Sequence, residues 1–310
     1  MPGPAVDRTA DPTTGAATGL GVDRWADGDG VRLHAVERGR GPLVVLLHGF
    51  PDFWYGWRHQ LPALAAAGFR TVALDLRGYN LSDRPPRVDD YRVSRLAADV
   101  RSAVRSLGAE RAHVVGHDWG GAIAWHLAER HPEVVDRLAV LNAPHPGRFA
   151  ELLRTPGQAV RSWYVGAFQI PLVPELLLGA AGRRLLLDAL RAMHRRPGAI
   201  TDADLARYDA AFARPGAIRA ALAYYRAAAR RSAEALGQGR RVERPTLVLW
   251  GERDPALRRE NADTLERWVP DLRVERVADA GHFVQADAPD VVNSALVRFL
   301  RAGRPAVRAR

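Results

Sequence analysis

The chain of 310 residues is predicted to adopt an α/β fold: a mostly parallel, doubly wound sheet with an inserted all-helical cap. Two patterns predict this class. Apolar runs of strand length alternate with helix-length segments in both halves of the sequence, which is typical of parallel strands buried on both faces. From 146 to 240 the pattern is only helical, and strands resume at 244. We therefore expect the helical segment to cover the carboxyl ends of the strands, where such folds bind ligands.

The expected elements follow from apolar or alternating runs that end near glycine or proline, and from the longer segments between them. Strands are expected at 31–39, 42–49, 69–78, 111–116, 137–144, 244–251 and 272–277. Core helices are expected at 55–67, 91–107, 119–130, 259–268 and 288–301, with breaks in the cap helices at 197–200 and 214–218.

These elements divide the chain into a core, a cap and two ends. The core comprises 22–145 and 241–302, and the cap comprises 146–240. Residues 1–21 are rich in Pro, Gly, Thr and Ala, so we expect a disordered leader there. The arginine-rich end, 303–310, is expected to be a frayed tail.

The composition limits the partners. The net charge is +10, but all 45 basic residues are arginines spread along the helices, so we expect solvated helix faces and no nucleic-acid partner. The longest apolar runs have strand length, which predicts no membrane span. The chain has no cysteine, and His113, His126 and His131 lack metal-ligand spacing, so no metal or other cofactor is expected. We expect a cytoplasmic protein, and a homodimer is left open.

The hexapeptide GHDWGG at 116–121 has the spacing of a nucleophile elbow, with Asp118 at the position of the nucleophile. Such an elbow is a sharp turn from strand to helix, and side chains at Gly116, Gly120 or Gly121 would collide with neighbouring backbone. Because the turn directs backbone N–H groups at the reacting carbon, Trp119 is expected to supply one oxyanion donor.

Further polar groups follow other predicted strands. The turn HGFP at 48–51 places the N–H of Phe50 as the second oxyanion donor. Asp254 and His282 follow later strands, and the chain order of nucleophile, acid and histidine is that of a catalytic triad. A single Asp after a strand is often only a helix cap, and a single His is often only a loop residue. The three together, each at a strand end, predict an active site.

On these motifs the chain resembles the epoxide hydrolase family of the α/β-hydrolase fold, whose nucleophile is an aspartate. The resemblance covers 22–302 and is strongest at 48–60, 116–121, 250–257 and 280–283. It implies that Asp118 attacks an epoxide carbon and forms an alkyl–enzyme ester. Water activated by His282, which Asp254 orients, then hydrolyses this ester to a diol.

The chemistry of a carboxylate agrees with these implied roles. A carboxylate is a poor reagent for carbonyl carbons, because the anhydride that results expels it again. It is a competent nucleophile at a strained sp³ carbon. Asp118 needs no proton removed, so His282 is free to act as a base in the second step alone.

The resemblance also implies cap tyrosines that donate hydrogen bonds to the opening alkoxide. Tyr225, in YYR at 224–226, matches the family motif for one of them. The family's other tyrosine stands directly before a Phe-Gln pair, and Ala167 occupies that position before Phe168. Tyr164 or Trp163 would replace it from the same helical face. Phe168, Trp163 and Trp54 are further expected to line the pocket.

Two alternatives remain open from the sequence. A haloalkane dehalogenase has the same nucleophile, but its second halide donor is commonly an asparagine at the position of Phe50, so Trp163 would have to replace it. A non-hydrolytic epoxide-handling or ligand-binding protein on this scaffold is the other. The expected substrate is a small, hydrophobic epoxide, with water as the second reactant.

Overall fold

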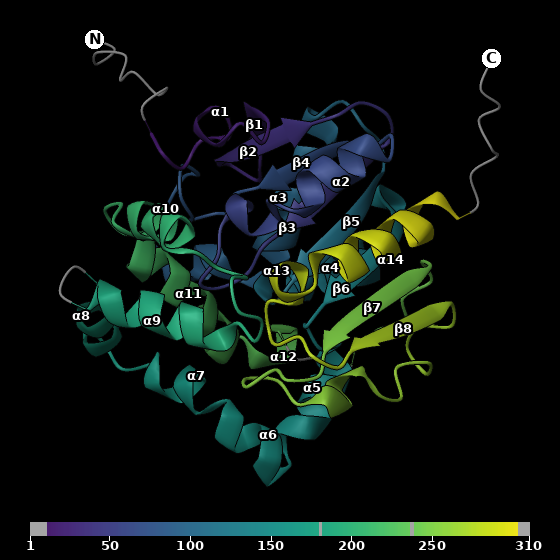
Figure 1. Cartoon of the computed structure of the whole chain (residues 1–310). Helices are drawn as coiled ribbons and strands as arrows, with labels where there is room; N and C mark the ends of the chain where they lie inside the picture. The colour runs from purple at the N-terminus through teal and green to yellow at the C-terminus, as the bar shows by residue number, and fades with distance from the viewer. Residues whose placement is uncertain (1–10, 180–181, 236–238, 303–310) are drawn as a thin grey trace, which may run out of the picture.

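The computed structural model describes residues 11–179, 182–235 and 239–302 (Figure 1). One sheet of eight strands forms its centre. The strands are β1 (Val22–Asp27), β2 (Arg32–Arg38), β3 (Leu43–Leu47), β4 (Arg70–Leu74), β5 (Ala112–His117), β6 (Val135–Leu141), β7 (Thr246–Gly251) and β8 (Leu272–Val277). Their order across the sheet is β1-β2-β4-β3-β5-β6-β7-β8.

The sheet is parallel from β4 to β8, and only β1 and β2 pair antiparallel with their neighbours. Strands β3, β5 and β7 are buried along their whole length. Their continuous apolar sequences are explained by this burial, because both faces of a central parallel strand are covered by helices. The carboxyl ends of these three strands lie at one edge, so the residues that follow them meet there.

The core helices cover the two faces of the sheet. They are α2 (Gln60–Ala66), α3 (Val93–Ser106), α4 (Trp119–Arg130), α13 (Val284–Asp287) and α14 (Pro289–Arg301). Helices α2 and α14 pack side by side in front of the sheet in the view of Figure 1, and α3 packs against α4. This arrangement is the predicted doubly wound α/β class, which is therefore confirmed.

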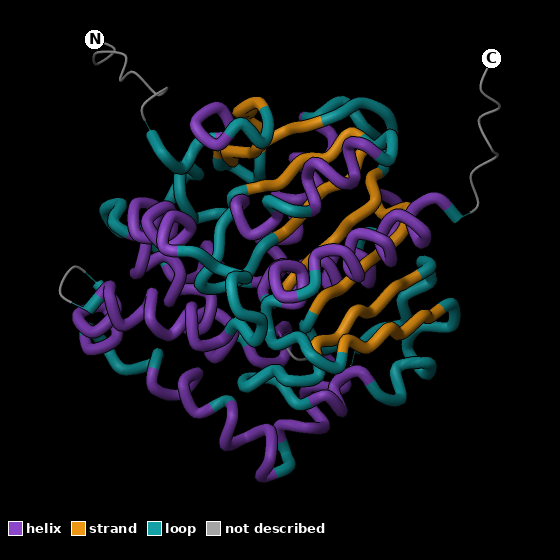
Figure 2. The backbone as a smooth tube through the Cα atoms, viewed as in Figure 1, coloured by secondary structure: helices purple, strands orange, loops and turns teal. Residues whose placement is uncertain are grey.

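All described elements between β6 and β7 are helices, and Figure 2 shows them grouped on one side of the sheet. They are α5 (Pro146–Leu153), α6 (Pro156–Arg161), α7 (Trp163–Ala167), α8 (Val173–Leu178), α9 (Arg183–Met193), α10 (Asp202–Phe212), α11 (Ala217–Arg230) and α12 (Ser232–Ala235). Both expected breaks are present: α10 begins after the first, and α11 begins at Ala217, within the second. Within the described part of the chain, no helix combines the length and the apolarity needed to cross a membrane.

Three details of the core differ from the expectation. Strand β1 was not predicted, because three of its six residues are charged and only one, Ala26, is buried. The helix expected at 55–67 is divided into a 3₁₀ helix, η2 (Trp54–Trp57), and α2. The helix expected at 259–268 is only the short η5 (Arg259–Ala262), because Thr264 adopts a left-handed φ of 55° that no helix accepts.

The leader was expected to be disordered over 1–21, and residues 11–21 differ from that expectation. They include the helical turn α1 (Gly15–Thr18), and Thr13 is fully buried. The indole of Trp54 donates to the Thr13 carbonyl at 2.7 Å, and Arg214 of the cap pairs with Asp11. These contacts give the segment tertiary partners that its composition does not indicate. Residues 1–10 and the expected tail at 303–310 lie outside the described residues.

A buried histidine joins this segment to the sheet through Asp23, whose Oδ1 also accepts from the N–H of Gly15 at 2.8 Å. His34 of β2 lies between two aspartates, with Nδ1 at 2.7 Å from Asp75 Oδ2 and Nε2 at 2.8 Å from Asp23 Oδ1. Burial lowers the pKa of His34, but hydrogen bonds and charge from the two aspartates outweigh burial and raise this pKa to about 9. His34 is therefore charged at neutral pH.

Candidate active site

Asp118 lies between β5 and α4 with φ 51° and ψ −119°, a conformation that a residue other than glycine rarely adopts. The surrounding glycines permit it. A Cβ on Gly116 would lie 2.3 Å from the carbonyl oxygen of Gly120, and one on Gly120 would lie 2.1 Å from the Leu47 oxygen. A Cβ on Gly121 would meet the Ala143 Cβ at 2.3 Å. The elbow is therefore the close strand-to-helix turn that the hexapeptide predicts.

The turn after β3 faces this elbow. The N–H of Phe50 donates to Asp118 Oδ1 at 2.8 Å. A Cβ on Gly49 would lie 2.2 Å from the same oxygen, so only glycine lets the turn approach the carboxylate. His48 is fully buried and its Nε2 accepts from the N–H of Leu76 at 3.0 Å, which ties the turn to the end of β4. The hydrogen bond from Phe50 thus fixes Asp118 Oδ1, and Oδ2 is left free to act as a nucleophile.

Asp254 and His282 complete a chain of contacts to Asp118. The Nδ1 of His282 lies 2.7 Å from Asp254 Oδ2, and its Nε2 lies 3.6 Å from Asp118 Oδ2. The side chains of Asp254 and His282 are 0% and 3% exposed, so water screens these charges poorly. The structure therefore brings together all three residues that the chain order predicts.

The charges of these residues depend on one another. Burial lowers the pKa of His282, but the charge of Asp254 and the hydrogen bonds and charge of Asp118 outweigh it and raise this pKa to about 10. Burial raises the pKa of Asp118, yet the neighbouring His282 holds it below its ordinary value. The pKa of Asp254 is lowered in the same way. The free site thus holds an imidazolium between two carboxylates.

A cavity of about 440 Å³ opens over Asp118 and Trp119, roofed by cap helices. Its lining is mostly apolar and includes several alanines. The other lining residues are Ala122, Pro144, Pro146, Phe149, Leu153, Ala159, Ser162, Tyr164, Val165, Gly166, Tyr225, Ala228, Ala229, Ser232, Ala235 and Leu257. A cavity of this size and polarity suits a drug-sized hydrophobic molecule.

Two tyrosines of the cap face this cavity. Tyr164 of α7 and Tyr225 of α11 have ring centroids 5.9 Å apart, and Phe168 packs on both rings. Burial and then the charge of Asp118 raise the pKa of each phenol above its ordinary value. Both are therefore neutral O–H donors near the carboxylate. Tyr224 points elsewhere, as expected, and donates to the Arg77 carbonyl at 2.7 Å.

None of the three expected pocket residues lines the cavity. Trp163 precedes Tyr164 directly but is 71% exposed, because a shift of one residue turns a helical side chain by about 100°. Trp54 is fully buried in the core, and its indole donates to the Thr13 carbonyl instead of lining the cavity. Phe168 does not line the cavity itself, and its ring packs against the rings of Tyr164 and Tyr225.

Two residues that contact the triad, and one that contacts the loop carrying Asp254, were missed in the sequence. Asn142, after β6, donates to Asp254 Oδ2 at 2.8 Å. His117 directly precedes Asp118, and its Nε2 lies 2.8 Å from the His282 carbonyl oxygen, so it is the donor. Gln158 of α6 contacts the loop that carries Asp254. Only the position of Asn142, at a strand end, offers a signal that sequence reasoning might use.

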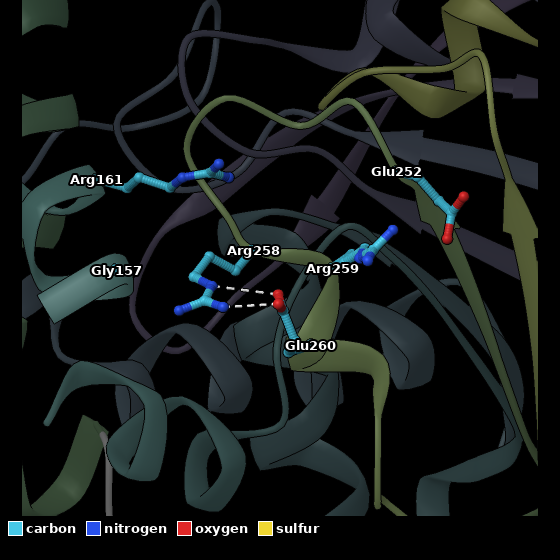
Figure 3. Close-up of a pocket in the computed structure, with 6 residues that line it drawn as sticks. All are labelled: Gly157, Arg161, Glu252, Arg258, Arg259 and Glu260. Carbon is cyan, nitrogen blue, oxygen red and sulfur yellow. Dashed lines mark hydrogen bonds and ion pairs between the residues drawn. The ribbon is translucent and has the colours of Figure 1, made fainter. Parts of the chain in front are cut away.

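A second cleft of about 400 Å³ shares no lining residue with the cavity and lies between α6 and the loop after β7 (Figure 3). It is lined by Gly157, Arg161, Glu252, Arg258, Arg259 and Glu260. Arg258 pairs with Glu260 at 2.6 Å, which satisfies both charges within the protein. Among the residues that the structure describes, no group of three or more His, Asp or Glu side chains is arranged to hold a metal ion.

Comparison with known proteins agrees with this geometry. The family profile described as alpha/beta hydrolase fold matches residues 42–289. The AB hydrolase superfamily protein YfhM of Bacillus subtilis is 38% identical over 90% of this chain and 97% of its own. Epoxide hydrolase 4 of Mus musculus is 40% identical over 88% of this chain and 77% of its own. A crystal structure of Bacillus megaterium epoxide hydrolase with an inhibitor, 35% identical, superposes with a TM-score of 0.81 over 90% of this chain and 100% of its own.

Proposed function

Because the chain belongs to the epoxide hydrolase family of the α/β-hydrolase fold, we propose that it opens an epoxide to a vicinal diol through an ester on Asp118. The observation that carries the proposal is the arrangement of Asp118. One of its carboxylate oxygens accepts from the Phe50 N–H, and the other lies 3.6 Å from His282 Nε2. Asp118 also lines a cavity that Tyr164 and Tyr225 line.

The first step is alkylation. Asp118 Oδ2 attacks one epoxide carbon, the C–O bond of the ring breaks, and its electron pair passes to the epoxide oxygen. Tyr164 and Tyr225 donate hydrogen bonds to this developing alkoxide. Their raised pKa values keep both phenols protonated, so each has an O–H to donate. Asp118 is a carboxylate at neutral pH and needs no base for this step.

The second step is hydrolysis of the ester. Alkylation removes the negative charge of Asp118, which is one of the two charges that raise the pKa of His282. The pKa of His282 therefore falls in the ester, and the imidazolium gives up its proton, which neutralises the alkoxide left by ring opening. The neutral imidazole then takes a proton from water while the water oxygen attacks Asp118 Cγ. Asp254 stabilises the imidazolium, and the N–H groups of Phe50 and Trp119 stabilise the oxyanion. Collapse breaks the Cγ–O(alkyl) bond, and the leaving oxygen takes the remaining proton of the added water. The diol is released, with Asp118 again a carboxylate and His282 again an imidazolium.

The substrate in this proposal is a small hydrophobic epoxide, since the cavity offers few polar partners beyond the catalytic groups. Water is the second reactant, and no cofactor takes part. The proposal also places the protein in the cytoplasm and includes no nucleic-acid partner. Whether two copies associate as a homodimer stays a prediction.

The dehalogenase alternative gains no support from the site. It requires a second N–H donor to the halide, and Phe50 offers no side-chain donor where asparagine would stand. Trp163 was the candidate replacement, but its side chain is 71% exposed and does not line the cavity. The ligand-binding alternative would give no reason for a histidine placed between the carboxylates of Asp254 and Asp118.

One turnover of an aryl epoxide such as styrene oxide in water enriched in heavy oxygen tests the proposal. An ester at Asp118 places an unlabelled protein oxygen in the first diol, and peptide mass spectrometry then finds the label in Asp118. Direct attack of water on the epoxide predicts a labelled diol and an unlabelled protein, which would refute the ester mechanism.

A further inference from the structure

Gln158 occupies an unusual place in the cap. It is the one buried residue of α6, a helix whose other residues include Val160 at 71% exposure. Its side chain is fully buried between the cap and the loop that carries Asp254. A buried amide lowers stability unless its hydrogen bonds are made, so its partners indicate what it holds in place.

Both the NH₂ group and the carbonyl oxygen of the Gln158 side chain form hydrogen bonds. Its Nε2 donates to the Ala256 carbonyl at 3.0 Å and to Ser162 Oγ at 3.1 Å. Its Oε1 accepts from the Arg258 N–H and from Asn261 Nδ2, both at 3.0 Å. The carbonyl and the N–H of the loop fix which end of the amide is which, because the reverse orientation would place donor against donor.

The loop segment that Gln158 holds is the one that binds the triad acid. The N–H groups of Ala256 and Leu257 donate to Asp254 Oδ1 at 2.8 and 2.9 Å. Gln158 thus hydrogen-bonds the carbonyl of Ala256, which is one of the two donors to Asp254, and the N–H of Arg258, which directly follows the other donor. Three residues along α6, Arg161 donates to the Asp254 carbonyl at 3.1 Å. Figure 3 shows Arg161 projecting from α6 toward this loop.

We propose that Gln158 is a positioning residue for ester hydrolysis. By holding Ala256 and Arg258, it fixes the turn that presents the Asp254 carboxylate to His282, and Arg161 supports the same turn from outside. The inference rests on the proposed roles of Asp254 and His282. It assigns to the cap a part in the second step, in addition to the tyrosines that it supplies for the first.

The test separates the two steps in single turnovers of styrene oxide, with the ester followed by intact-protein mass after rapid quenching. Gln158→Met keeps the side-chain volume and removes every hydrogen bond. We expect hydrolysis to slow about 10-fold while alkylation stays within about 3-fold, so that the ester accumulates. The pH midpoint of hydrolysis should fall, because a loosened Asp254 raises the pKa of His282 less.

A second variant tests whether Gln158→Met acts through misfolding, and a control tests whether loss of any buried contact between core and cap has the same effect. Arg161→Met alters an exposed side chain, which does not endanger folding, and should slow hydrolysis about 3-fold in the same direction. Tyr55→Phe removes another buried contact between core and cap, the 2.7 Å hydrogen bond to Asp204, and should leave both steps unchanged. The amount of ester formed in the first turnover gives the fraction of folded, active protein in each sample, to which the rates are normalised.

Each outcome decides between the explanations. If both variants hydrolyse the ester at the wild-type rate and pH midpoint, Gln158 only holds the cap and the inference is wrong. The same conclusion follows if Gln158→Met slows alkylation as much as hydrolysis, or if Tyr55→Phe reproduces its effect. If the wild-type protein forms no ester at all, the proposed function fails, and this result is distinct from the others.

Discussion

Replacing Tyr164 with phenylalanine removes one phenolic O–H from the cavity and leaves the ring in place. The ring is held by Phe168 and Tyr225, at centroid distances of 5.7 and 5.9 Å, so the variant should keep the shape of the pocket. What it loses is one of two hydrogen bonds to the alkoxide that forms when the epoxide opens. We expect alkylation of Asp118 to slow and ester hydrolysis to remain unchanged.

The magnitude follows from burial and charge. A hydrogen bond to a charged group is worth about 1.5–3 kcal/mol, and this one lies in a cavity that screens charge poorly. Taking about 2–3 kcal/mol for a donor in this position predicts alkylation roughly 30- to 150-fold slower. The loss should not exceed this range, because Tyr225 still donates to the same oxygen.

Stopped-flow fluorescence offers a direct assay, since Trp119 lines the cavity and packs on Tyr225 at 5.1 Å. The matched control is Trp163→Phe, one residue away but 71% exposed, for which we expect alkylation within about 2-fold of the wild type. An unchanged alkylation rate in Tyr164→Phe would refute the role of this phenol. A loss confined to Trp163→Phe would show that the indole is the second donor in place of Tyr164.

Three further predictions concern the triad, the His34 cluster and the elbow. His282→Gln should slow hydrolysis about 10²- to 10⁴-fold and leave the ester on Asp118, which intact-protein mass spectrometry detects as the mass of the added substrate. The His34 cluster stabilises the fold fully below the unfolded pKa of about 6.5 and loses this contribution as pH rises through about 9, so thermal melts should show Tm falling across that window, and less so in His34→Gln. Gly116→Ala should lower the unfolding free energy by at least about 2 kcal/mol, because its Cβ would lie 2.3 Å from a backbone oxygen, whereas Gly166→Ala, with nothing within 4 Å, should not; equal denaturation midpoints for the two variants would contradict this reasoning.

The sequence predicts the core well where buried strands carry the signal. The strand ends after β3, β5 and β7 were each predicted within two residues, because continuous apolar runs that stop at glycine have few other interpretations. Strand β1 lacks that signal, since it lies at the edge of the sheet and is held by pairing with β2 and not by burial. The segment at 259–268 looks helical by composition, but contacts with the cap hold it in another form, as the bond from Asn261 to Gln158 illustrates.

The site residues, too, could be predicted where they follow buried strands and could not where they depend on contacts between distant segments. Asp118, Asp254 and His282 follow strands, so their meeting at one edge of the sheet follows from the fold. The positions of Tyr164 and Trp163 depend on the rotation of a five-residue helix, which no periodicity of that length can fix. Asn142 and Gln158 could not be predicted, because hydrogen bonds between segments more than ninety residues apart leave no local pattern.

In the proposed mechanism, the cap acts on the two chemical steps through neighbouring parts of one segment. Tyr164 lies six residues after Gln158, and Ser162 between them accepts from the Gln158 amide while lining the cavity. The Tyr164 phenol, proposed to stabilise the alkoxide, and the Gln158 amide, proposed to position Asp254, are thus connected by the short path from α6 to α7. A change that moves α6 should disturb hydrolysis first, since α6 contacts the Asp254 loop directly, and alkylation only as far as α7 follows. The ratio of the alkylation rate to the hydrolysis rate in single turnovers therefore measures how rigidly α6 and α7 are connected.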